Sequence, residues 1–318
     1  MNRLHLITLV VFCVQLGYSQ QLPLFTQYRS NQGLINPAAF NSDYFSDEHN
    51  FSFGGSYRNQ WTGFEGNPRT QNIWGEYFQQ KRGGFNLLTG GYLLNDQTGP
   101  TGFTGVYGRI GGIFSSDPRF SGISVALNLG AVQYRIDGND LRFRDEGDVV
   151  GMENRAQWYP DAGLGVFAYT ALDGGFFDDD YLYGGISIPQ VMGLDLTFEN
   201  PDGTFYTKRV QHIYAQAGLY HYFSDESFLE TSTWVKYAVN TPVNVDLNVR
   251  YQMQSNFWGG AGLSSSGTIH LEAGFILGAN AGFDNNLKIG YGFDHYLTTF
   301  GPFTGPSHEL NLTFSIER

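Results

Sequence analysis

The sequence predicts an all-β fold, namely a transmembrane antiparallel β-barrel of about 14 strands in a bacterial outer membrane. Three observations lead to this fold class. The chain begins with a pattern typical of a secretion signal, and many later segments alternate apolar and polar residues. The composition combines 42 glycines and 16% aromatic residues with only 15% charged residues in 318 positions. Glycine is unfavourable in helices, so a helical bundle is disfavoured.

Charge and composition exclude further classes. The formal net charge of −12 would repel a polyanion, so nucleic acid is not an expected partner. The aromatic content also argues against a disordered chain, because such side chains bury large apolar areas. A large, acidic β protein remains.

Residues 1–19 are predicted to be a signal peptide. Arg3 precedes an apolar run over 6–16, and we expect cleavage after Ser19. The run is too short for a membrane anchor. A lipoprotein signal around Cys13 is the other alternative, although Phe12 suits lipid attachment poorly. The mature chain would contain no cysteine, which excludes disulfides and thiol chemistry.

Alternation with period two is clearest over 243–254. Val245, Leu247 and Val249 share one face, whereas Asp246 and Asn248 share the other. A soluble sandwich would alternate too. Polar faces rich in Gly, Asn and Gln rather than Lys and Glu, together with the signal peptide, favour a barrel whose apolar faces contact lipid.

The barrel is expected to occupy 50–318, with fourteen strands. Aromatic residues near segment ends suggest girdles at the membrane interfaces, and these are Tyr159, Tyr181, Tyr183, Tyr220, Tyr222, Trp258 and Tyr291. The expected strands cover 50–58, 72–78, 85–94, 102–114, 119–135, 159–169, 181–188, 211–223, 228–239, 243–253, 256–263, 268–277, 287–294 and 308–316.

Connection lengths predict the orientation of the barrel. The four longest connections, 59–71, 136–158, 189–210 and 295–307, all follow odd-numbered strands. Outer-membrane barrels have long outer loops and short periplasmic turns, so the N- and C-termini are both expected in the periplasm. Segment 20–49 precedes the barrel. It is expected to plug the lumen, to form a periplasmic handle, or to pack as an extension on the barrel base.

Several short motifs along nearly the whole mature chain resemble those of one family. They are Phe25–Tyr28 with Asn36–Ala38, Tyr57–Trp61 followed by Gly66, Pro68 and Thr70, Asn95–Pro100, Leu182–Gln190, Gly290–Asp294 and Ser307–Leu310. In this order they resemble the PorP/SprF family of outer-membrane proteins, which is associated with the type IX secretion system of Bacteroidota. Each motif is weak alone, and the ordered set is specific.

The resemblance implies a non-enzymatic barrel that binds and displays a secreted partner at the cell surface. The implied partners are a protein with a type IX C-terminal sorting domain, in some family members a gliding adhesin, and components of the secretion machinery. Outer-membrane lipid surrounds the barrel. The candidate partner-binding residues lie in or near the first outer loop, since Trp, Tyr and Arg are frequent hot spots, and they are Tyr57, Arg58, Gln60, Trp61 and Pro68.

Alternatives exist for these residues and for the function. Trp61 and Tyr57 would instead anchor the barrel at the membrane interface, while Arg58 would pair inside the lumen. The alternative function is a passive, porin-like solute channel. No catalytic residue, metal site or cofactor is predicted, because the histidines show no HExxH spacing and no Gly-x-Ser-x-Gly occurs. The acidic loop 137–148 lacks the EF-hand pattern.

Overall fold

The structure is a computed structural model. It describes residues 24–40, 44, 49–81, 83–137, 155–172, 174, 180–192, 195–200, 203–208, 210–225, 227–254, 256–278, 282–299 and 301–316, with the backbone alone at 155, 195–200 and 203–208. The predicted signal peptide, 1–19, and most of loop 136–158 lie outside these residues.

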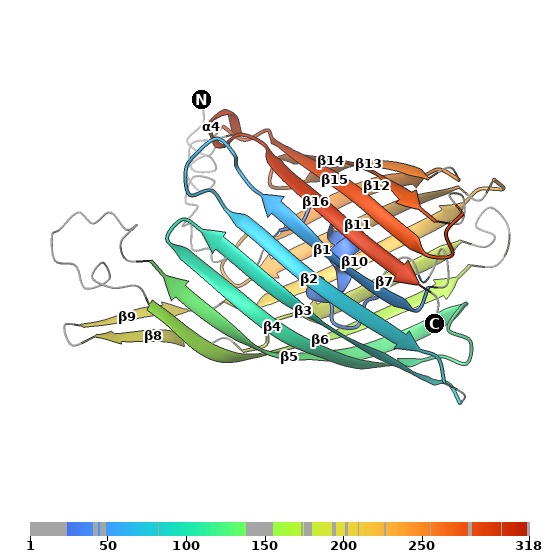
Figure 1. The fold of residues 1–318 in the computed structure, drawn as a ribbon, viewed down its shortest axis with the longest axis horizontal. Coiled ribbons are helices and arrows are strands. Elements are labelled where there is room, and N and C mark those ends of the chain that lie inside the picture. Colours follow the sequence, from blue (N-terminus) through green and yellow to red (C-terminus); the bar gives the residue numbers. More distant parts are fainter. Residues whose placement is uncertain are drawn as a thin grey trace, which may run out of the picture.

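Fourteen strands of the described chain form one closed antiparallel barrel, which confirms the predicted fold class (Figure 1). Strands adjacent in sequence are neighbours, β7 pairs with β10, and β16 closes the barrel on β1. Each predicted strand overlaps one barrel strand. These are β1 (Phe51–Asn59), β2 (Arg69–Gln79), β3 (Phe85–Thr98), β4 (Thr101–Phe114), β5 (Ser121–Ile136), β6 (Arg155–Ala171), β7 (Tyr181–Ile188), β10 (His212–Tyr222), β11 (Phe228–Ala238), β12 (Asn244–Gln252), β13 (Phe257–Ser264), β14 (Thr268–Leu277), β15 (Asn286–Tyr296) and β16 (Ser307–Ile316).

The alternation of the sequence becomes an outer and an inner face of the barrel. In β12, Leu247 and Val249 are exposed, whereas Asp246, Asn248 and Arg250 are buried. A polar side chain is buried on this inner face because other polar groups in the lumen bond to it, while the apolar outer face suits lipid.

Two connections contain structure that the sequence pattern does not predict. Predicted loop 189–210 holds a separate two-stranded sheet, β8 (Asp195–Asn200) with β9 (Gly203–Lys208). Loop 297–306 contains the short helix α4 (Gly301–Thr304). Within the described chain, no helix has the length and hydropathy needed to cross a membrane.

The barrel has two different ends. We call the end with connections 60–68, 137–154, 189–211 and 297–306 the loop end; in Figure 1 it carries α4 and the β8–β9 sheet. The opposite end is the turn end, where Phe51 of β1 pairs with Ile316 of β16.

The N-terminal segment lies inside the barrel. We call residues 24–40 the plug; it contains η1 (Tyr28–Asn31) and α2 (Gln32–Ile35), which lie between the strand walls in Figure 1. Leu24 lies at the loop end, beside Tyr296 and Ser266, so the plug enters the barrel opposite Ile316. The expectation of two periplasmic termini concerns residues outside the described chain. The described ends do not support it, because they lie at opposite ends of the barrel.

The predicted aromatic girdle is mostly wrong. Tyr183, Tyr220 and Trp258 are buried inside the barrel, and of the seven residues only Tyr291 is largely exposed on the outside. Tyr183 and Tyr220 pack in the cluster that surrounds Phe40 of the plug. Their position near strand ends is real, but these rings fill the lumen, where the plug supplies apolar partners.

Candidate functional site: the plug and the mouth of the barrel

Arg58 of β1 organises the contacts of the plug near the loop end. Its guanidinium pairs with Asp294 of β15 and with Glu309 of β16, the latter at 3.4 Å, and donates to the Thr26 hydroxyl. Glu309 also accepts the backbone N–H groups of Thr26 at 2.7 Å and Gln27 at 3.1 Å. Three strands therefore hold one turn of the plug through charge-assisted hydrogen bonds.

Arg29 makes the equivalent contacts deeper in the lumen. It pairs with Glu230 of β11 at 3.0 Å and with Glu272 of β14, and donates to Ser232 at 3.1 Å. The adjacent Tyr28 hydroxyl also bonds to Ser232, at 2.6 Å. All these side chains are almost completely buried, so each charge depends on its partners.

Asn36 fixes the plug towards the turn end. Its Oδ1 accepts the backbone N–H of Ala38 at 2.9 Å, and its Nδ2 donates to the Val166 carbonyl of β6 at 3.1 Å. The strands facing Asn36 have glycines at this point, Gly165 and Gly185. A Cβ atom at either position would collide with the Asn36 amide. These two glycines are required because the plug approaches the strands closely.

A second pair of glycines seats the other end of the plug. A Cβ on Gly290 would collide with Gln27, and one on Gly292 would crowd Thr26. Both belong to the β15 motif that ends at Asp294, which also accepts a hydrogen bond from the Thr26 hydroxyl at 2.9 Å. The β15 wall is therefore shaped to receive this part of the plug.

The five predicted partner-binding residues separate into three environments. Tyr57 is 40% exposed and lies on the outer face beside Leu310, in the lipid-facing position. Arg58 is 3% exposed and holds the plug. The prediction that Arg58 contacts a partner at the surface is therefore wrong, and its alternative, pairing inside the lumen, is what the structure shows. Gln60, Trp61 and Pro68 lie in loop 60–68, where the Gln60 N–H bonds to the Pro68 carbonyl at 2.8 Å.

Loops 60–68 and 297–306 pack against each other at the loop end. The N–H of Thr62 bonds to the Pro306 carbonyl at 3.0 Å, and that of Gly63 bonds to the Thr304 carbonyl at 2.8 Å. This contact leaves Phe64 45% and Phe303 77% exposed.

Trp61 is half-buried and lies beside these two exposed rings. It has a φ of 54°, an uncommon conformation for a large residue, and its ring lies 6.3 Å from that of Phe64. We call Trp61, Phe64 and Phe303 the loop-end aromatic surface. Such an exposed aromatic group is typical of interaction sites.

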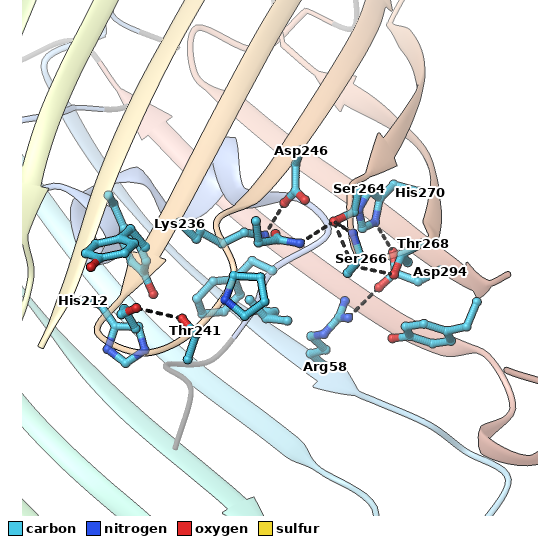
Figure 2. Close-up of a pocket in the computed structure, with 18 residues that line it drawn as sticks. Arg58, His212, Lys236, Thr241, Asp246, Ser264, Ser266, Thr268, His270 and Asp294 are labelled. Carbon is cyan, nitrogen blue, oxygen red and sulfur yellow. Dashed lines mark hydrogen bonds and ion pairs between the residues drawn. The ribbon is translucent and has the colours of Figure 1, made fainter. Parts of the chain in front are cut away.

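A cavity of about 110 Å³ lies at the loop end, between the plug and the wall (Figure 2). We call it the mouth pocket. Its charged and imidazole side chains come from β1, β10, β11, β12, β14 and β15, and they are Arg58, His212, Lys236, Asp246, His270 and Asp294. No group of three or more His, Cys, Asp or Glu side chains in the described chain has the spacing to hold a metal ion.

These features define a class of protein, an outer-membrane β-barrel whose lumen holds its own N-terminal segment. Similar solved structures include a mutant of the monoaromatic hydrocarbon channel TodX (11% identity, TM-score 0.54, covering 91% of this chain and 94% of that chain). They also include the Pseudomonas putida toluene transporter TodX (9%, 0.51, 93% and 98%) and a Pseudomonas aeruginosa FadL homologue (10%, 0.50, 90% and 93%). At these identities they show the fold alone.

The chain belongs to the PorP/SprF family. The family model described as type IX secretion system membrane protein PorP/SprF matches residues 17–314, nearly the whole chain. This confirms the resemblance and supports an outer-membrane location. A comparison with curated protein sequences gives no match.

The motifs that carried the resemblance meet in the structure. Thr26, Arg58, Asp294 and Glu309 come from four separate motifs and form the single cluster around Arg58. Sequence reasoning did not identify Arg29, or the plug contacts that these residues make. One pattern in the sequence could have indicated these contacts. Charged residues occupy inward-facing positions of the strands, and a buried charge needs a partner in the lumen.

Proposed function

We propose that this type IX secretion barrel is a non-enzymatic docking protein that binds a secreted partner at its loop end. The partner class is a protein with a type IX C-terminal sorting domain, of which a gliding adhesin is one example. One observation carries the proposal: the lumen holds the plug, while the loop end presents Phe64 and Phe303 to solvent beside the half-buried Trp61. The loop end therefore offers a surface to a partner, whereas the plug occupies the lumen that an open channel would need.

The proposal requires the loop end to face the outside of the cell and Ile316 to face the periplasm. The mature chain contains no cysteine if the signal peptide is removed, so single cysteines report accessibility. We expect Phe303→Cys and Ser266→Cys to be labelled on intact cells by a membrane-impermeant maleimide. Asp225→Cys, in the turn after β10, should be labelled only after lysis. The opposite pattern would reverse the orientation.

Loss of the aromatic surface should release the partner. We expect Trp61→Ala combined with Phe303→Ala to weaken capture from detergent-solubilised outer membranes by about 30-fold or more, since a hot-spot truncation costs about 2 kcal/mol. Tyr57→Ala is the matched control, because that ring faces lipid beside the same loop. Equal capture by the double variant and the control would show that the loop-end aromatic surface does not bind the partner.

The second candidate function is a passive solute channel with the plug as its gate. Inward-facing polar residues and the mouth pocket favour it, and the similar TodX structures are described as channels or transporters. Planar-bilayer recordings separate the two functions. A stable open current from the intact, partner-free protein would favour the channel.

A further inference from the structure

The residues that line the mouth pocket include two with a buried polar atom that has no hydrogen-bond partner in the described part of the chain. Asp246 is 3% exposed; one carboxylate oxygen pairs with Lys236, and Oδ1 has no partner. His270 Nδ1 lies 2.7 Å from Asp294 Oδ1, and its Nε2 also has no partner among the described residues. A buried acceptor such as Asp246 Oδ1 indicates a missing donor.

The free carboxylate oxygen and the rings of the pocket suit a cationic donor. Among the described residues, Arg58 and Lys236 are the permanent cations that line the pocket. Three carboxylates oppose them, since Asp246 and Asp294 line the pocket and Glu309 pairs with Arg58. Asp294 and Glu309 are paired through both of their oxygens, whereas Asp246 Oδ1 is left as an acceptor. The aromatic rings of Phe25, Tyr214 and Tyr296 also line the cavity, and aromatic faces attract ammonium and guanidinium groups.

The pocket is continuous with the loop-end aromatic surface. Tyr296 lines the cavity, and its ring lies 6.2 Å from the ring of Trp61. A volume of about 110 Å³ suits the end of one extended side chain. Ser266 and Pro242, which are exposed, form part of the rim.

We propose that the mouth pocket binds the cationic end of a lysine or arginine side chain, with Asp246 Oδ1 as its acceptor. This inference rests on the proposed function, in that the side chain belongs to the secreted partner. The aromatic surface would bind the body of the partner, and the pocket would select for a cation beside it.

Small probes test the pocket without the partner. We expect Nα-acetyl-lysine amide and Nα-acetyl-arginine amide to bind the full-length protein in isothermal titration. Nα-acetyl-norleucine amide, which has a similar stem and no charge, should bind about ten-fold more weakly or not at all. Asp246→Asn should remove the preference. Glu76→Gln is the control, because Glu76 pairs with Arg109 elsewhere in the lumen.

Two outcomes would overturn the inference. One is equal binding of the charged and uncharged probes, and the other is tighter binding of Nα-acetyl-glutamate amide. Should Asp246→Asn fail to fold, Ser266→Trp blocks the rim from an exposed turn and should abolish probe binding. Because no partner is present in this assay, failure of the docking proposal leaves its result unchanged.

Discussion

Deletion of residues 24–40 is expected to turn a closed barrel into an open pore. The plug contacts inward-facing side chains of strands around the barrel, from Arg58 of β1 and Ser187 of β7 to Glu309 of β16. Its removal leaves polar strand faces that water can fill. In planar bilayers the deletion variant should carry a stable current, whereas the intact protein should not. A folded deletion variant without current would show that other residues close the lumen.

A single substitution tests the same closure without deletion. Gly290→Val would place a side chain where Gln27 lies, so we expect it to displace the plug and raise the conductance. Gly259→Val is the matched control, because a Cβ atom at this exposed glycine of β13 meets nothing closer than 3.8 Å. Equal conductance of the two variants would contradict the close fit of plug and wall.

Replacement of Arg29 by Met is expected to cost about 3–5 kcal/mol, because Glu230 and Glu272 would keep buried charges without their partner. The methionine keeps the apolar stem of the arginine, so the effect reports charge more than volume. Thermal unfolding in detergent, followed by the heat-dependent shift in gel mobility, measures the loss.

Neutralising the two carboxylates should restore this stability. We expect Arg29→Met with Glu230→Gln and Glu272→Gln to recover most of the loss, since no uncompensated charge then remains in the lumen. Glu76→Gln is the control for removal of a different lumen carboxylate, which pairs with Arg109. A triple variant as unstable as Arg29→Met alone would mean that Arg29 acts through packing.

The barrel could be predicted from the sequence because its signal is local. Alternation in segments such as Asn244–Gln252 places Leu247 and Asp246 on opposite faces, and lipid outside with polar groups inside determines which face is which. The β8–β9 sheet escaped this reasoning because it lies in a long connection where no barrel face imposes the pattern.

The plug contacts could not be predicted in the same way. For Arg58, which lies three residues before Trp61, the sequence left both a surface site and a pairing inside the lumen open. Strand alternation turns Arg58 into the lumen, while the chain leaves the strand before Trp61. Pairing of Arg29 with Glu230 and Glu272 joins residues about 200 or more positions apart, so it depends on closure of the barrel. The aromatic girdle was wrong for the same reason, since Tyr183 and Tyr220 pack on a plug that the local pattern does not show.

Affinity capture of the tagged protein from detergent-solubilised native outer membranes, with mass spectrometry of the eluate, tests the docking role most directly. We expect recovery of a large secreted protein with a type IX C-terminal sorting domain, and its loss in the Trp61→Ala, Phe303→Ala variant. Recovery of the barrel alone, under mild detergent and with its candidate partners expressed, would contradict the docking role and favour the channel.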